Sequence, residues 1–294
     1  MKTTTAILSC LAALVLAAGT ASAQQGGFTL FGPSAPAIKG DNAFVHPVTS
    51  PYWHEDSFIT SDVRAWYISH RFNDEVAPLR NGQVTGMAVQ VRLALTDSLQ
   101  FVAYKDGYLD FGAPFSQTGW NDVAAGLKWQ WLKLDNEAMY SAIGAGYELP
   151  IGDPGVLQND SEVRLWASFN KGFGKLHLGA TANYRISLTD ENKDAGNSDV
   201  FSWHLHADYR ATEIFSPIVE FNGFHITNEG GGLALNGADV TNLGGGNDAT
   251  ITGAIGCEIR AGEHTAIRGA YEIPLNSKDD LFGTRFTFSL VYSF

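Results

Sequence analysis

Hydrophobic and polar residues alternate along most of the chain, from about Phe58 to its end. Successive side chains of a β-strand point to opposite faces, so alternation over about 10 residues predicts a strand with one apolar and one polar face. Twelve segments follow this pattern; in one of them Leu127 and Trp129 alternate with Lys128 and Gln130. The pattern predicts an all-β fold of about 12 strands.

The connections between these segments alternate between short and long. The short ones are Thr96-Asp97-Ser98, Asp135-Asn136-Glu137, Gly172-Phe173-Gly174, Ala211-Thr212-Glu213 and Ala261-Gly262-Glu263. The long, polar ones run from Asn73 to Gly82, Asp106 to Asn121, Ile151 to Ser161, Thr189 to Asp199, Thr227 to Asp248 and Asn276 to Phe282. Short periplasmic turns opposite longer external loops are typical of transmembrane β-barrels. A soluble β-sandwich or barrel has no reason to keep this rhythm through twelve strands.

The last strand carries aromatic residues on one face and ends the chain on Phe294. Phe286, Phe288 and Tyr292 alternate with the polar Thr287 and Ser289. This strand resembles the closing strand of bacterial outer-membrane β-barrels, in which the terminal Phe belongs to the signal that the barrel-assembly machinery reads. The resemblance implies a transmembrane antiparallel up-and-down β-barrel in the outer membrane, with outer-membrane lipids and the assembly machinery as partners.

Two strand ends strengthen this resemblance. Tyr147-Glu148-Leu149-Pro150 and Tyr271-Glu272-Ile273-Pro274 each lead into a long connection. A proline at the end of a strand stops the ladder without removing an internal hydrogen bond. These ends are similar to those of uncharacterised, porin-like outer-membrane transporters.

The N-terminus predicts an exported precursor. Lys2 precedes an apolar stretch at 7–18, and Ala21-Ser22-Ala23 forms a small-residue cleavage site. The stretch of about a dozen residues is shorter than the roughly 20 that a membrane-spanning helix needs. We therefore expect a signal peptide at 1–23, an irregular segment at 24–57 and the barrel at 58–294. The segment 24–57 has two interpretations, a periplasmic lead-in, which we favour, or a plug folded into the lumen.

Charge and cysteine content narrow the partners. Removal of residues 1–23 takes away Lys2 and no acid, so the formal charge changes from −12 to −13. Such an acidic chain argues against nucleic acid as a partner. Cys257 is then the only cysteine, which excludes an intramolecular disulfide and a cysteine-based metal site. No cofactor is expected.

If the apolar face contacts lipid, the polar face lines the lumen. Its charged residues have two interpretations: they pair across the interior and brace a closed barrel, or they line a passage and set its selectivity. Small residues on the same face, such as Gly144, Gly179 and Ala254, leave free volume and favour a passage. The candidate selectivity residues are Arg164, Arg185, Arg210, Glu220, Glu258, Arg260 and Arg268.

His204, His206 and Asp208 share the lumenal face of one strand. Two imidazoles and a carboxylate suit a zinc-like ion. Successive residues on one face of a strand are nearly 7 Å apart, however, which is far for both imidazoles to reach one metal. We therefore favour a hydrogen-bonded lumen lining over a metal site.

These observations predict an outer-membrane channel, similar to a porin, that lets a small-molecule solute diffuse passively. A non-conducting structural or surface-interaction barrel is the first alternative. An outer-membrane hydrolase is the second; such barrels need a His with a nearby Ser nucleophile, and the sequence contains no His-x-Ser motif. We assign no catalytic residue. Nothing in the pattern identifies the solute or its charge.

Overall fold

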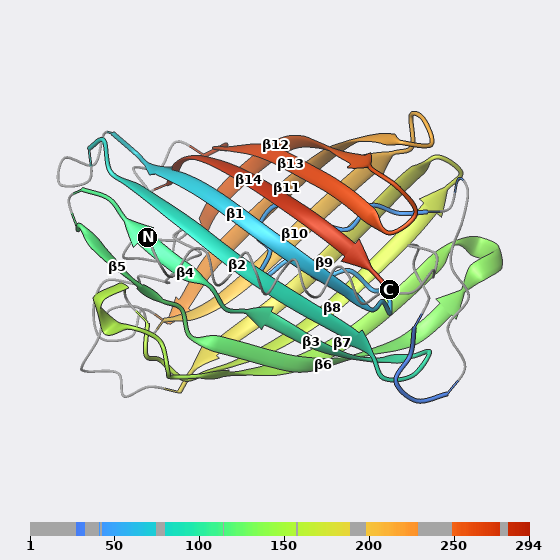
Figure 1. Ribbon diagram of the computed structural model, residues 1–294, viewed down its shortest axis with the longest axis horizontal. Helices are drawn as coiled ribbons and strands as arrows, with labels where there is room; N and C mark the ends of the chain where they lie inside the picture. The colour runs from blue at the N-terminus through green and yellow to red at the C-terminus, as the bar shows by residue number, and fades with distance from the viewer. Residues whose placement is uncertain are drawn as a thin grey trace.

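The computed structural model describes residues 28–32, 41, 43–74, 80–113, 115–156, 158–188, 198–228, 249–276 and 282–294. The expected signal peptide at 1–23 lies outside these residues, as do parts of the long connections. The described chain is almost entirely strand (Figure 1): β1 (Asp62–Phe72), β2 (Gln83–Ala94), β3 (Leu99–Lys105), β4 (Tyr108–Phe111), β5 (Gln117–Trp120), β6 (Val123–Leu134), β7 (Met139–Leu149), β8 (Glu162–Phe173), β9 (Leu176–Ser187), β10 (Asp199–Tyr209), β11 (Phe215–Asn228), β12 (Ala249–Arg260), β13 (Thr265–Pro274) and β14 (Phe282–Ser293).

The strands form one closed antiparallel sheet. β1 pairs with both β2 and β14, so the first and last strands close the barrel. β3 and β4 pair in succession with β2, while β6 pairs with β3 and β5 pairs with β4. The fourteen described strands therefore occupy twelve positions around the barrel. The predicted twelve-stranded, up-and-down antiparallel barrel is confirmed.

The outer surface of the barrel is apolar. Burial alternates along the strands as the sequence predicts, with the hydrophobic set exposed; in β10, for example, Leu205 is 45% exposed while His204 and His206 are buried. Apolar patches much larger than a few hundred Å² mark surfaces that contact lipid or other proteins. Large outward residues occur on every side: Met87, Phe101, Leu127, Ile143, Leu165, Leu178, Leu205, Phe221, Ile255, Tyr271, Phe286 and Phe288.

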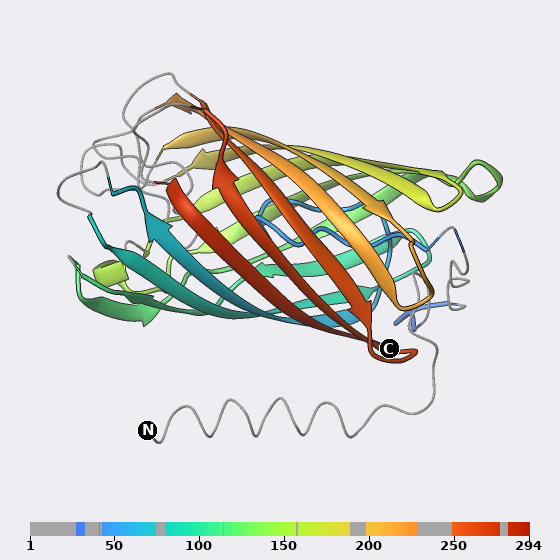
Figure 2. The same cartoon turned by 90° about the horizontal axis from the view of Figure 1, so that it is seen from above.

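Short turns join the strands at one end of the barrel, which we call the short-turn end; the other is the long-loop end (Figure 2). The turn between β8 and β9 needs a residue with positive φ, and Gly174 supplies it at +62°. The backbone N–H of Phe294 donates to the carbonyl of Ser61, 3.0 Å away, so the last residue lies beside the start of β1. Among the described residues, no helix is long and apolar enough to cross a membrane.

The start of β1 differs from the sequence-based expectation, and β1 also carries an inward-facing tryptophan. β1 begins at Asp62, so residues 58–61 lie inside the barrel rather than in its wall. Trp66 has the aromatic character of an interfacial residue, yet it faces inward at 4% exposure and donates to Gln90 Oε1 at 3.0 Å. Alternation in β1 places Trp66 on the same face as Asp62 and Arg64, and this register decides its direction.

Candidate functional site

A re-entrant stretch of chain fills the lumen. Residues 43–61, here called the lumen segment, are buried along their whole length and run inside the strands in both views of the barrel (Figures 1 and 2). The segment has no regular ladder of its own, so its backbone N–H and C=O groups need partners on the wall. The inward-facing side chains of the strands supply many of them.

The ascending half of the segment is bound by two carboxylates. The backbone N–H of Val45 donates to Asp208 Oδ2 at 3.2 Å. The N–H groups of Val48 and Thr49 donate to the two oxygens of Glu220 at 2.9 and 2.7 Å. Hydrogen bonds to a charged acceptor are stronger than neutral ones, so these carboxylates anchor the segment to β10 and β11.

The tip of the segment lies at Tyr52 and Trp53. The Tyr52 hydroxyl donates to the carbonyl of Asp106 at 2.7 Å. The guanidinium of Arg164 donates to the carbonyls of Tyr52 and Trp53, the latter at 2.7 Å. On one side of the tip the inward faces are apolar, in contrast to the polar lumen face expected from the sequence; Tyr52 and Trp53 belong to one buried cluster with Trp66, Val84, Leu109, Phe111, Val156 and Phe224.

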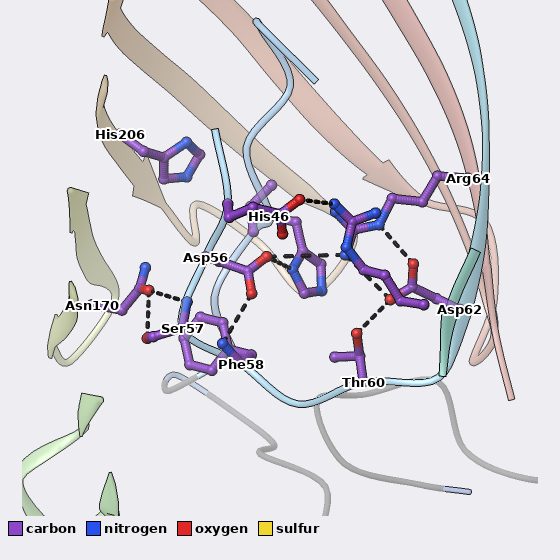
Figure 3. Close-up of polar contacts among 12 residues, drawn as sticks. His46, Asp56, Ser57, Phe58, Thr60, Asp62, Arg64, Asn170 and His206 are labelled. Carbon is purple, nitrogen blue, oxygen red and sulfur yellow. Dashed lines mark hydrogen bonds and ion pairs between the residues drawn. The ribbon is translucent and has the colours of Figure 1, made fainter. Parts of the chain in front are cut away.

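The descending half of the segment carries two adjacent acids. Glu55 Oε1 pairs with Arg92 at 2.9 Å, and Asp56 Oδ1 pairs with Lys128 at 3.3 Å. Asp56 Oδ2 also lies 2.5 Å from His46 Nδ1 and 3.9 Å from Arg64. Figure 3 draws both contacts as dashed lines. These contacts bind the segment to β1, β2 and β6, opposite the strands that bind its ascending half.

The exit of the segment is held by further polar and aromatic contacts. The N–H and hydroxyl of Ser57 both donate to Asn170 Oδ1, at 2.9 and 2.6 Å (Figure 3). Phe58 packs between Phe44 and Tyr140, with ring centroids 4.8 and 5.1 Å away. The segment therefore enters and leaves at the short-turn end, with its tip inside the barrel.

Burial and neighbouring charge set the ionisation of the segment. Burial alone would raise the pKa of Asp56, but Lys128, His46 and Arg64 outweigh it and lower that pKa well below its usual value. Burial lowers the pKa of His54 to about 4, because a charged imidazole there would lose its hydration. At neutral pH Asp56 is thus ionised and His54 is uncharged.

The cavities found between the segment and the described part of the wall are small. A cavity of about 50 Å³ opens at the short-turn end beside Phe44, His46 and Arg260. Two more, of about 20 and 10 Å³, flank Tyr52 near the tip. A cavity needs roughly 10–15 Å³ of such volume for one water molecule, so these cavities accommodate a few waters.

The free volume expected from small inward residues is occupied. A Cβ added at Gly144 would lie 2.1 Å from the Trp166 ring, and one at Gly179 would lie 2.8 Å from the Asn170 amide. These glycines make room for side chains of neighbouring strands, and the lumen segment takes the centre. The sequence shows which inward residues are small but not which side chains pack against them.

All seven candidate selectivity residues lie on the inward side, as alternation predicts, but they do not converge on one constriction. Arg164 and Glu220 bind the lumen segment directly. Arg185 pairs with Glu162 of β8 at 3.0 Å, towards the long-loop end. The remaining four lie towards the short-turn end, where Glu258 pairs with Arg260 at 3.1 Å and Arg268 at 2.7 Å, and Arg210 interacts electrostatically with Arg260.

His204, His206 and Asp208 form part of a hydrogen-bond network. His206 places one ring nitrogen 2.7 Å from Glu220 and the other 3.2 Å from Asp208. His204 contacts Asn222 at 2.7 Å and Ser202 at 3.0 Å. Within the part of the chain that the structure describes, no group of three or more His, Cys, Asp or Glu side chains is arranged to hold a metal ion.

The sequence-based selection did not include three cations that bind the segment, Arg64, Arg92 and Lys128. Alternation places Arg92 and Lys128 on the polar face, so their direction was predictable. Their role, which is to bind the lumen segment, depends on Glu55 and Asp56. These two acids lie outside the alternating segments, so the sequence pattern does not predict where they are placed. The sequence feature that could have indicated these contacts is the pair of adjacent acids, because the barrel that follows carries many inward-facing cations.

The arrangement defines a class of protein: a closed β-barrel with an apolar exterior and a lumen occupied by the lumen segment of its own chain. No protein-family model matches the chain, and no curated protein matches it. Among solved structures it is similar to the KdgM porin in complex with disordered oligogalacturonate, at 9% identity and a TM-score of 0.49, over 79% of this chain and 99% of that chain.

Two further solved structures are similar in the same general way. The β-domain of the Bordetella autotransporter BrkA has 12% identity and a TM-score of 0.46, over 80% of this chain and 99% of that chain. LpxR from Salmonella typhimurium has 9% identity and a TM-score of 0.41, over 79% of this chain and 100% of that chain. At such values the likeness concerns the barrel in general and carries no information about activity.

Proposed function

We propose that this chain is a porin-like outer-membrane barrel whose passage for small solutes is held closed by the lumen segment and opens when that segment leaves the lumen. The observation that carries the proposal is the polar contact surface between the segment and the wall. Val48 and Thr49 are bound by Glu220, and Glu55 and Asp56 by Arg92 and Lys128.

A segment that served only to fill the barrel would be better made of apolar residues. Replacing buried ion pairs by well-packed hydrophobic side chains is often neutral or stabilising, so such pairs are weak support for a purely structural role. Charged groups on both sides of the contact surface can instead be hydrated once the segment has left. This supports a removable plug over the non-conducting structural barrel.

The exterior supports the membrane location. Outward residues such as Leu165, Leu205 and Ile255 are between 45% and 70% exposed, and they suit a lipid environment. The hydrolase alternative has less support, because His206 and Asp208 are buried and used to hold one another and the segment. Passive diffusion through a permanently open lumen is less well supported than a gated passage.

The test is single-channel recording of the refolded mature protein in a planar bilayer, beside a variant that lacks residues 24–57. The intact protein should be mostly closed with infrequent openings, and the deletion variant should conduct steadily. Heat-modifiable gel mobility identifies folded barrels in both preparations. A folded deletion variant that stays silent contradicts the proposal.

A further inference from the structure

Three cations form a buried cluster on one side of the lumen. Arg64 on β1, Arg92 on β2 and Lys128 on β6 are each no more than 1% exposed. Burying a charge costs free energy unless it is paired. The partners of this cluster therefore determine its chemistry.

The lumen segment supplies most of the negative charge that this cluster contacts. Within the described part of the chain, the carboxylates within 4 Å of Arg92 and Lys128 are those of Glu55 and Asp56. Arg64 has one acid on the wall, Asp62, at 2.7 Å, and shares Asp56 with Lys128. When the segment leaves, three cations face the lumen with a single wall carboxylate beside them.

Glu55 and Asp56 occupy this cluster as a small dianion would. The two carboxylates come from adjacent residues, and one contacts a guanidinium while the other contacts an ammonium. Lys128 lies between them, 3.3 Å from Asp56 and 3.9 Å from Glu55. A guanidinium and an ammonium side by side suit two carboxylates that one molecule holds close together in space.

We infer that Arg64, Arg92 and Lys128 form a binding site for small organic dicarboxylates, which Glu55 and Asp56 occupy while the barrel is closed. The inference rests on the proposed function, because the site becomes available only when the segment leaves. The plug and the solute then compete for the same cations. The open passage prefers anions although the mature chain carries a formal charge of −13 after loss of Lys2.

The experiment uses the full mature chain with Glu55→Gln and Asp56→Asn, which keeps the length of the segment and removes its two charges. A second full-length variant, Glu220→Gln, loosens the segment from the opposite wall and leaves the cluster intact. Reversal potentials in a KCl gradient report anion preference. Sodium succinate is the dicarboxylate probe, and sodium acetate is the monocarboxylate comparison.

Open channels of both variants should prefer chloride over potassium, and succinate should reduce their current at lower concentration than acetate does. Adding Arg92→Gln and Lys128→Gln should lower the preference for chloride over potassium by roughly sevenfold per charge, or about fiftyfold for the pair, because a unit charge about 7 Å away in water shifts the energies of the two ions by about RT in opposite directions. It should also abolish the difference between succinate and acetate.

Channels that open but show neither chloride preference nor selective block by succinate overturn the dicarboxylate site and leave the gated barrel standing. Equal block by succinate and acetate also overturns it. Folded protein that stays silent in both variants and in the variant lacking residues 24–57 contradicts the proposed function, and this inference with it.

Discussion

Glu220 shows how one wall side chain controls the lumen segment. Its carboxylate accepts the N–H groups of Val48 and Thr49, and one of its oxygens lies 2.7 Å from His206. Glu220→Gln keeps the shape but removes the charge that strengthens these bonds. Bonds to charged groups contribute about 1.5–3 kcal/mol each, so hydrogen exchange at Val48 and Thr49 should accelerate about tenfold or more.

Exchange at these amides is read by mass spectrometry of the refolded barrel. Glu213→Gln is the matched control, because Glu213 is exposed in the short turn between β10 and β11. It should leave exchange at Val48 and Thr49 unchanged. Equal exchange in wild type and Glu220→Gln would remove Glu220 as an anchor.

His54 gives the docked segment a pH dependence of known sign. Burial lowers its pKa to about 4, an effect that His206 increases and that Glu220, Asp56 and Glu55 oppose. A solvated His titrates near 6.5, so between about pH 6.5 and 4 the released segment binds more protons than the docked one. The contribution of His54 to docking is complete above this window and is lost as the pH falls through it.

Channel openings should therefore become more frequent as the pH falls, by at most about tenfold per unit from this one group. His54→Gln should flatten that part of the profile. His225→Gln is the control, since Trp203 Nε1 donates to His225 at 3.1 Å, away from the segment. A profile equally steep in wild type and His54→Gln would show that another group titrates.

For single residues, the sequence predicted the direction of the side chain but not its contacts. Alternation placed Arg164, Glu220 and Lys128 on the inward face, where the structure has them. It did not reveal that all three bind residues 43–61, because the lumen segment has no period from which its contacts follow. Alternation also gave no reason to expect apolar residues such as Leu109 on the inward face near the tip, since β4 has only four residues and carries the aromatic Tyr108 on its outward face as well.

At the scale of elements, the strands and the lumen segment are specified in different ways. A strand such as β12 shows its two environments in its own sequence, through exposed Ile255 and buried Glu258. The alternation of short turns and long loops then predicts that consecutive strands are antiparallel neighbours in the barrel. The segment at 43–61 instead folds against surfaces contributed by many strands, so its position is a property of the completed barrel. The barrel was accordingly predictable, whereas a segment inside the lumen was the less favoured of the two interpretations of residues 24–57.

The outer face of β12 allows a direct test of the lipid environment. Ile255 lies in the middle of the strand at 70% exposure, and Ile259 lies near its short-turn end at 45% exposure. Ile255→Arg should lower the free energy of unfolding from vesicles by about 2–4 kcal/mol, as expected at a bilayer midplane. Ile259→Arg, the control nearer the interface, should cost about 0–1 kcal/mol. Equal, small effects in denaturant titrations would argue against a membrane-spanning wall.

At the scale of the whole molecule, the charges are distributed on two opposite sides of the lumen. Asp208 and Glu220 hold the ascending half of the lumen segment by its backbone N–H groups. Arg92 and Lys128 hold the descending half by its acidic side chains. The segment therefore depends on both walls at once, and loss of either set should weaken its docking and raise the open fraction of the barrel.

The most direct measurement of this closure locks the segment in place. Thr49 and Asn222 are in contact near the tip, with Oγ1 and Nδ2 3.0 Å apart, so Thr49→Cys and Asn222→Cys in a Cys257→Ser background should form a disulfide between segment and wall. In single-channel recordings the oxidised protein should stay closed, and reduction should restore wild-type openings. Unchanged openings in the oxidised protein, with the cross-link verified by mass spectrometry, would show that the lumen segment does not close the barrel.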